Sequence, residues 1–162
     1  MPTLSSLLML AAAIFAGAVV PLQAGANANL GRLLGHPLSA TVVSLAVSLA
    51  LIVPVLIALR APLPNLAVAF KGPWWIWIGG AAGAIYITAA LILAPKLGAA
   101  SFIVAVIAGQ MLVSMLIDHF GLMGFPVKPV NAARLAGLLL IVGGMVITQI
   151  ANASPALAAT TR

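Results

Sequence analysis

Seven polar side chains stand out in an otherwise strongly apolar chain, because their groups can bind a solute or carry a proton. They are Gln23, Asn27, Tyr86, Gln110, Ser114, Asp118 and His119. Amides, a phenol and a hydroxyl donate and accept hydrogen bonds, whereas a carboxyl and an imidazole also exchange protons. Neutral groups of this kind favour a neutral or zwitterionic solute, since a lone organic cation would prefer a buried carboxylate. We therefore expect the first five to line a substrate path, and Asp118 and His119 to form a gate or a proton-handling pair.

The composition places the chain in a membrane. Of its 162 residues, 64% are hydrophobic and only 5% are charged, whereas about a quarter of the residues in a soluble domain are charged. Seven Lys and Arg residues face a single acid, Asp118, but they are scattered singly near the ends of hydrophobic runs. This distribution is typical of topology anchors and forms no basic patch, so we expect a lipid bilayer as partner and no nucleic acid. With no cysteine and no cluster of other ligands, the sequence indicates no metal site and no cofactor.

Five hydrophobic runs are each about 20 residues long, which allows a helix to cross a hydrocarbon core of about 30 Å. They cover residues 4–24, 38–59, 74–94, 99–117 and 134–151. We therefore predict an all-α integral membrane protein with one five-helix transmembrane domain, residues 1–151, and a disordered tail, residues 152–162. No basic residue precedes the first run, so we expect it to remain as a span rather than to be removed as a signal peptide.

The end of the first run is unusually polar for a membrane helix. Residues 21–37 combine proline, glycine, asparagine and glutamine with an arginine and a histidine. The ring of Pro21 removes one backbone donor and crowds the carbonyl of Gly17, so we predict that the first helix is kinked or broken there. Freed backbone groups at membrane depth must face protein or water, which makes this segment the expected edge of the path. Gln23 and Asn27 are four residues apart and would share a helix face, either lining a cavity or hydrogen-bonding a neighbouring helix.

Small residues indicate where helices can approach closely. Gly17 in the first run and the Gly79-x-x-x-Gly83 pattern in the third have no side chain to keep another helix away. Tyr86 follows on the face of Gly79 and Gly83, and it either caps a cavity or has its hydroxyl satisfied by a neighbour. We expect packing roles for these three glycines.

Gln110, Ser114 and Asp118 recur every four residues and form one polar stripe along the fourth run. Unpaired polar groups are costly in hydrocarbon, so this stripe should face protein or water. Asp118 lies at a helix C-terminus, where the macrodipole disfavours an acid, so it needs a partner. The candidates for that partner are His119, Lys128 and Arg134. The resulting pair would either fix the loop at the membrane interface or handle protons or substrate.

Five spans place the two termini on opposite sides of the membrane. The cations on the side of the N-terminus would be Arg60, Lys71, Lys128 and Arg134, and those on the other side Arg32, Lys96 and Arg162. The small excess favours a cytoplasmic N-terminus and leaves insertion in both orientations open. A five-span unit is small for enclosing a path, and its inverted copy would supply the inverted repeat common in transporters. We therefore predict a homodimer, with an antiparallel arrangement favoured over a parallel one and the site near the subunit contact.

Several blocks of residues, in order along nearly the whole chain, resemble one known family. They are Pro21-x-Gln23-Ala24-Gly25-x-Asn27-Ala28, Leu30-Gly31-Arg32-x-Leu34-Gly35-His36-Pro37, Pro73-Trp74-Trp75-x-Trp77-x-Gly79-Gly80, Ala94-Pro95-x-Leu97-Gly98-Ala99, Gly109-Gln110 and Asp118-His119-Phe120-Gly121. These blocks resemble the YdcZ-like family, five-helix proteins of the bacterial inner membrane in the drug/metabolite transporter superfamily. The resemblance implies an exporter of small molecules and names no substrate.

The resemblance to this superfamily also implies a relationship to the small multidrug resistance proteins. These are four-helix antiparallel dimers that couple cation export to protons through an embedded glutamate. This sequence has no glutamate, so we do not expect a direct copy of that mechanism. A facilitator, or coupling through Asp118 and His119, stays open.

The sequence thus predicts a secondary transporter or facilitator that works by alternating access, and the resemblance implies export. The alternative from another class is a small membrane scaffold or accessory subunit, whose amides and glycines serve packing alone. An enzyme is not expected, because one aspartate with one adjacent histidine is too little for most catalytic sites.

Overall fold

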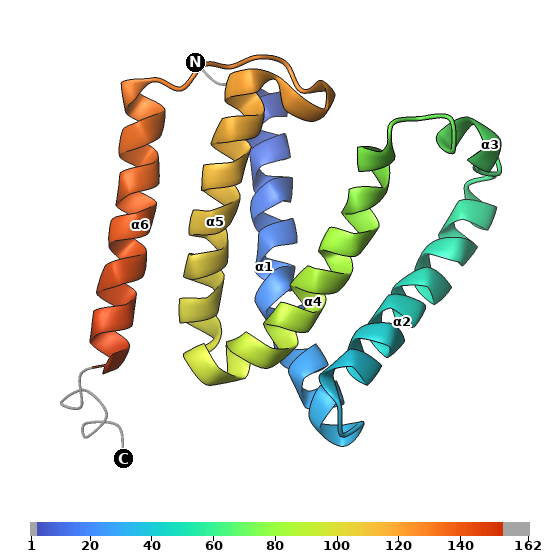
Figure 1. Ribbon diagram of the computed structural model, residues 1–162, viewed down its shortest axis with the longest axis horizontal. Coiled ribbons are helices and arrows are strands. Elements are labelled where there is room, and N and C mark those ends of the chain that lie inside the picture. The colour runs from blue at the N-terminus through green and yellow to red at the C-terminus, as the bar shows by residue number, and fades with distance from the viewer. Residues whose placement is uncertain (1–2, 154–162) are drawn as a thin grey trace. The chain divides into compact units, whose positions relative to one another are not determined.

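The computed structural model describes residues 3–153, which form helices and no strand (Figure 1). The long helices are α1 (Leu4–Leu33), α2 (Pro37–Ala58), α4 (Ile78–Leu97), α5 (Ala99–Phe120) and α6 (Ala132–Ala153). Three short elements lie between them, namely α3 (Leu66–Ala69) and the 3-10 turns η1 (Trp74–Trp77) and η2 (Leu122–Gly124). Of the expected disordered tail, residues 152 and 153 belong to α6, and the rest lies outside the described residues.

Five of the described helices are long and apolar enough to cross a membrane. The spans contain between 21 and 30 residues, and at a rise of about 1.5 Å per residue even the shortest reaches across about 30 Å. At most 22% of the most apolar window of any span is buried, so most of each helix surface is available to lipid or to another protein. The expected all-helical, five-span architecture is confirmed.

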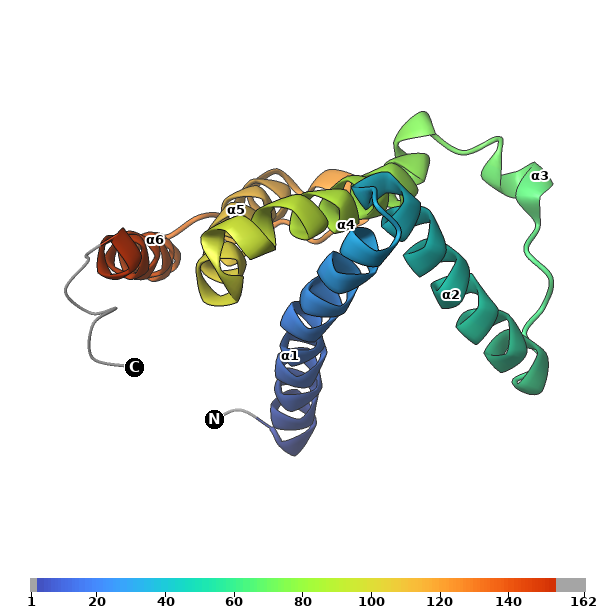
Figure 2. The same cartoon turned by 90° about the horizontal axis from the view of Figure 1, so that it is seen from below.

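The chain forms two compact units that join in sequence between Lys96 and Leu97. Unit 1 contains α1, α2 and α4, and unit 2 contains α5 and α6. In unit 1, α1 and α2 lie closest at the turn that joins them and diverge away from it (Figure 2). In unit 2, α5 and α6 lie side by side (Figure 1). The candidate site residues are therefore divided between two units.

Helix α1 is longer than the predicted first span, because it continues through Pro21 to Leu33. The segment that we expected to be kinked or broken is thus not broken. Alanine and leucine around Pro21 favour helix, and polar side chains support the turns that follow. Asn29 Nδ2 donates to the Gly25 carbonyl at 3.2 Å, and Arg32 donates to Asn29 Oδ1. A bend at Pro21 stays a prediction.

A short turn reverses the chain between α1 and α2. Gly35 has φ +75°, which glycine adopts at little cost. The Nδ1 atom of His36 accepts a hydrogen bond from the Leu38 N–H at 3.1 Å and so caps α2. Pro37 is the first residue of α2, where its missing N–H costs no helical hydrogen bond. The end of α1 and the start of α2 are thereby held together.

The other spans begin or end a few residues from their predicted limits. The third span opens with η1, and its helix α4 ends at Leu97 rather than at residue 94. Helix α5 runs to Phe120, so Asp118 and His119 lie within its last turn. Helix α6 begins at Ala132, two residues before the predicted limit. Hydropathy marks the apolar part of a helix, whereas the helix itself continues until its terminal backbone groups find other partners.

The core of unit 1 lies where α2 and α4 meet near the end of α1. Ala40 is fully buried against Ile87 and Leu91, with Leu30 and Tyr86 packed around them. A Cβ added to Gly31 would lie 3.2 Å from Leu91 Cδ2 and 3.7 Å from the Ala40 Cβ. The missing side chain at this position therefore allows α1 to approach the other two helices.

Gly31, rather than the three glycines expected to serve packing, makes the close contact seen here. A Cβ added to Gly17, Gly79 or Gly83 would meet no other atom within 4 Å. The packing roles of these three glycines therefore stay predictions.

Polar contacts tie α5 to α6 at opposite ends of unit 2. Ser101 is fully buried at the start of α5, and its Oγ accepts a hydrogen bond from Asn152 Nδ2 at 2.5 Å. At the other end, Asp118 of α5 pairs with Arg134 of α6. Neither Ser101 nor Asn152 was recognised from the sequence, because hydroxyls and amides near helix ends are common and their pairing depends on how the helices pack.

Candidate functional site

Three of the five predicted path residues come together in unit 1, between α1 and α4. Gln23 and Asn27 of α1 and Tyr86 of α4 line one small cavity. Its volume is about 10 Å³, roughly the room that one water molecule needs. The four-residue spacing puts the two amides on one face of α1, and the small Ala24 and Ala90 beside them let the helices approach.

The two amides of this cavity are not used to hold the described helices together. Neither Gln23 nor Asn27 has a side-chain hydrogen bond among residues 3–153. Asn27 is nevertheless only 8% exposed. The amide of Asn27 is therefore left for a water molecule or a ligand.

A larger cavity lies at the ends of α1 and α4 and the start of α2. Its volume is about 350 Å³, and its charged lining residues are Arg32 and Lys96. The wall also contains Gly31 and Gly35, which leave space, and apolar side chains including Leu91. Sequence reasoning missed this cavity by treating the two cations only as topology anchors. The predicted topology already places Arg32 and Lys96 on the same side of the membrane. This shared side could have indicated that the two cations lie near each other.

Gln110 and Ser114 belong to unit 2, so their place beside the other path residues stays a prediction. Both side chains are exposed, and neither makes a hydrogen bond within the part of the chain that the structure describes. Asp118 follows one turn later on α5. The polar stripe expected from the four-residue spacing therefore includes two groups without protein partners among the described residues.

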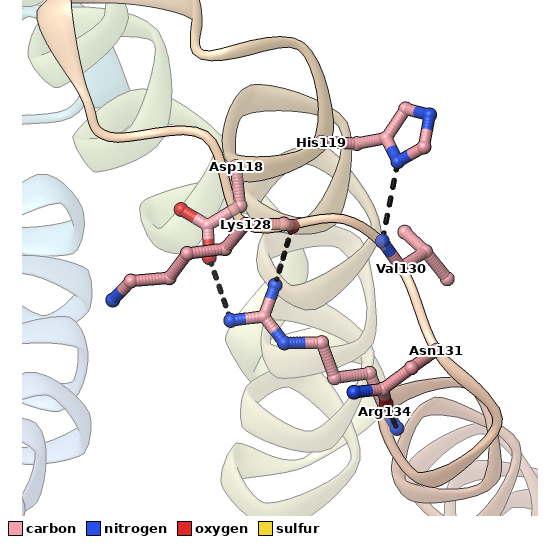
Figure 3. Close-up of polar contacts among 6 residues, drawn as sticks. All are labelled: Asp118, His119, Lys128, Val130, Asn131 and Arg134. Carbon is pink, nitrogen blue, oxygen red and sulfur yellow. Dashed lines mark hydrogen bonds and ion pairs between the residues drawn. The ribbon is translucent and has the colours of Figure 1, made fainter.

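Asp118 takes Arg134 as its partner (Figure 3). The Arg134 Nη2 atom lies 3.1 Å from Asp118 Oδ2, and both side chains are about 30% exposed. Arg134 Nη1 also donates to the Lys128 carbonyl at 3.1 Å, while the Lys128 N–H donates to the Asp118 carbonyl at 2.7 Å. Asn131 Oδ1 accepts from the Arg134 N–H at 2.9 Å and caps the start of α6. This arrangement ties both helix ends to the loop between them.

His119 does not face the Asp118 carboxylate, because the two side chains point away from each other (Figure 3). The Nδ1 atom of His119 accepts a hydrogen bond from the Val130 N–H at 3.1 Å. Its ring also contacts the Phe120 ring edge-on, with the ring centres 4.7 Å apart. The imidazole therefore fixes the far part of the same loop, with Nε2 left for other partners.

Within residues 3–153, no group of three or more His, Cys, Asp or Glu side chains is arranged to hold a metal ion.

Comparison with known proteins gives a family for the chain. Residues 8–147 match the family model described as "Putative inner membrane exporter, YdcZ". No curated protein and no solved structure matches. The matched residues run from the first turns of α1 into α6, and so include all of α2, α4 and α5. With five helices able to cross a membrane, the chain therefore belongs to the YdcZ family of inner membrane exporters and is a multi-pass inner membrane protein.

Proposed function

We propose that this chain is a secondary transporter or facilitator that exports a small polar or amphipathic molecule by alternating access. The family description supports a transporter rather than an enzyme. The observation that carries the proposal is the buried Asn27 amide, which lines a cavity with Gln23 and Tyr86 and has no hydrogen bond within residues 3–153. Donors and acceptors of this kind can replace the water around a solute that crosses the membrane.

The cavity around these amides is too small for a metabolite, as expected if the path is closed at this level. A cavity of about 10 Å³ admits a water molecule and excludes a metabolite. Transport would then require α1 and α4 to separate at this level. A bend of α1 at Pro21, just before Gln23, would give that movement a place to occur.

We propose that the working unit is a homodimer, antiparallel rather than parallel. Gln110 and Ser114 are exposed and have no partner within residues 3–153, and lipid would leave such groups unpaired. A second copy would cover them and complete the path. The open faces at Gly17, Gly79 and Gly83 are where another helix can approach most closely.

Asp118 and His119 would act as a gate. The ion pair between Asp118 and Arg134 ties α5 to α6, and protonation of Asp118 would weaken it. Proton coupling would then operate through this pair rather than through an embedded glutamate.

The proposal is tested by flux measurements on purified protein in proteoliposomes, with amines, amino acids, sugars and carboxylates, with and without a proton gradient. We expect saturable flux of one class. Asn27→Leu should lower its rate by about tenfold, which corresponds to one lost hydrogen bond to the solute. Gln23→Leu and Gln110→Leu should also lower it.

Gln149→Leu is the matched control for the two Gln→Leu variants, because it makes the same change on α6, outside the proposed path. Equal flux in Asn27→Leu and wild type would remove Asn27 from the path. Silence across the panel, with inserted and folded protein, would favour the alternative of a scaffold or accessory subunit without transport activity of its own.

A further inference from the structure

The larger cavity of unit 1 brings together two cations that the proposed amide path does not use. Arg32 lies in the last turn of α1 and Lys96 in the last turn of α4, and both line the cavity of about 350 Å³. The start of α2 at Pro37 completes the same wall. Two positive charges from separate helices therefore border one space.

No acid side chain in unit 1 balances these charges. The chain has a single acid, Asp118, which belongs to unit 2 and pairs with Arg134. Among residues 3–153, Arg32 donates to Asn29, and Lys96 has no side-chain hydrogen bond or ion pair. A guanidinium has five N–H donors and an ammonium has three, so most donors at this cavity are left for a ligand.

A simpler explanation covers each cation separately. A basic residue in the last turn of a helix is stabilised by the macrodipole and marks the membrane interface. That explanation does not account for a shared cavity. Arg60 and Lys71 also follow helices of unit 1, and they line neither of the two cavities described above.

The rest of the wall is mainly apolar and limits what can bind. Ala28, Leu91, Ile92 and Pro95 contribute to it. The volume holds on the order of ten water-sized groups, and it falls near the small end of ligand sites, which measure about 300–1,000 Å³. A fitting ligand has an anionic group for the two cations and a short apolar body for the wall.

We propose that this cavity binds an amphipathic anion, whose carboxylate or phosphate group contacts Arg32 and Lys96 and whose apolar body lies against Leu91 and Ile92. The planar guanidinium suits two oxygens of such a group, and the ammonium adds a second charge. The smaller cavity follows directly along the same two helices, at Asn27 and Ala90. The claim that this anion is also the transported substrate rests on the proposed function. The claim that it binds in the cavity does not.

The test is the binding of octyl phosphate to the full chain in nanodiscs of phosphatidylcholine. Octyl trimethylammonium and octanol carry the same apolar chain and serve as comparison probes. Wild type should bind octyl phosphate saturably and about tenfold more tightly than either comparison probe. Equal affinity for the cationic probe would overturn the proposal.

Substitutions show whether the two cations are responsible. The double variant R32Q/K96Q should bind octyl phosphate about tenfold more weakly. The control R60Q/K71Q removes the same number of charges from unit 1 outside the cavity, and its affinity should stay within about twofold. R32K/K96R keeps both charges and should retain binding. Unchanged affinity in R32Q/K96Q would contradict the inference.

If R32Q/K96Q does not fold, wild type in rising salt answers the same question. Binding that depends on the exposed Arg32 and Lys96 should weaken several-fold between about 50 mM and 500 mM salt. Binding that is insensitive to salt would overturn the proposal.

A lipid headgroup and a soluble metabolite share this chemistry, and native mass spectrometry distinguishes them. Phosphatidylglycerol retained in preference to phosphatidylcholine by wild type, and lost in R32Q/K96Q, would support the site with lipid as its source. Octyl phosphate binding without lipid retention would support it with a soluble anion. If wild type neither retains phosphatidylglycerol preferentially nor binds octyl phosphate, the proposal is overturned. Binding of octyl phosphate without flux of any solute would contradict the proposed transport and support the anion site. Flux without binding would support transport and contradict the anion site.

Discussion

The Asp118 carboxylate and the Arg134 guanidinium neutralise each other across the loop between α5 and α6, with Oδ2 and Nη2 3.1 Å apart. Each charge lies at a helix end that disfavours it, since Asp118 is in the last turn of α5 and Arg134 in the first turn of α6. Pairing removes both penalties. The contact therefore stabilises two helix ends together.

Replacing Asp118 by Asn should lower the free energy of unfolding by about 1 kcal/mol, because the pair is partly exposed and Arg134 then keeps an unbalanced charge. Unfolding in detergent micelles, followed by circular dichroism, measures the change. A double-mutant cycle with Arg134→Gln isolates the pair from effects of each side chain alone. Zero coupling in that cycle would contradict the role given to the ion pair.

The same Asp118→Asn variant separates a structural role from proton handling. If Asp118 is the coupling group, the variant loses the response of flux to a proton gradient in proteoliposomes while it still inserts. Arg134→Gln breaks the ion pair and leaves the carboxyl in place, and it should lose the response too, because the proposed coupling operates through the pair. A gradient response that survives in Asp118→Asn would exclude Asp118 from coupling.

Replacing His119 by Ala should speed hydrogen exchange at the Val130 amide by about tenfold, because the acceptor Nδ1 of that N–H is removed. Exchange measured by mass spectrometry on the peptide containing Val130 reports the change. His119→Asn keeps an acceptor close to the position of Nδ1 and should exchange at nearly the rate of wild type. Equal rates in all three proteins would show that this hydrogen bond does not hold the loop.

Thr41 and Thr88 should contribute about 1 kcal/mol to holding α2 against α4. Their Oγ1 atoms are 2.9 Å apart, and each lies within hydrogen-bond distance of the carbonyl four residues earlier. Each hydroxyl has one proton, so one threonine donates to the other while the second donates to the carbonyl of its own helix. Thr41→Val keeps the shape and removes the link. Thr148→Val on α6 is the matched control, because Thr148 bonds only the Gly144 carbonyl of its own helix. If both substitutions destabilise equally in thermal unfolding, the link between α2 and α4 adds nothing.

Replacing Gly121 by Ala should destabilise the protein more than replacing Gly124. Both glycines have positive φ, +63° and +81°, and a side chain in this region costs about 1–2 kcal/mol. A Cβ at Gly121 would also lie 2.6 Å from Val127 Cγ2, whereas one at Gly124 would meet nothing within 4 Å. Adding Val127→Ala to Gly121→Ala should recover part of the loss. No recovery would show that backbone strain alone is responsible.

The spans could be predicted because hydropathy and helix length depend on local sequence. The five runs correspond to the five long helices, although Leu33 and Phe120 lie beyond the predicted ends. The polar segment after Pro21 is helical, and Asn29 donates to the Gly25 carbonyl of its own helix. A composition rich in Asn and Gly does not reveal such internal pairing.

Residue spacing predicts which side chains share a face of one helix, but not which helices meet at the candidate site. Spacing places Gln23 and Asn27 on one face, but Tyr86 joins them through packing between α1 and α4. The cavity at Arg32 and Lys96 depends on the approach of α1 to Leu91, which the missing side chain of Gly31 permits. Neither spacing nor hydropathy measures a distance between helices.

The contact between Ser101 and Asn152 has a consequence for synthesis of the chain. Ser101 leaves the ribosome 51 residues before the amide that pairs with its buried hydroxyl. Until α6 has been made, α5 lacks this partner as well as Arg134, so the Ser101 hydroxyl and the Asp118 carboxylate would enter the bilayer unpaired. We expect α5 to wait at the insertion machinery for α6 and the two to enter the bilayer as a hairpin.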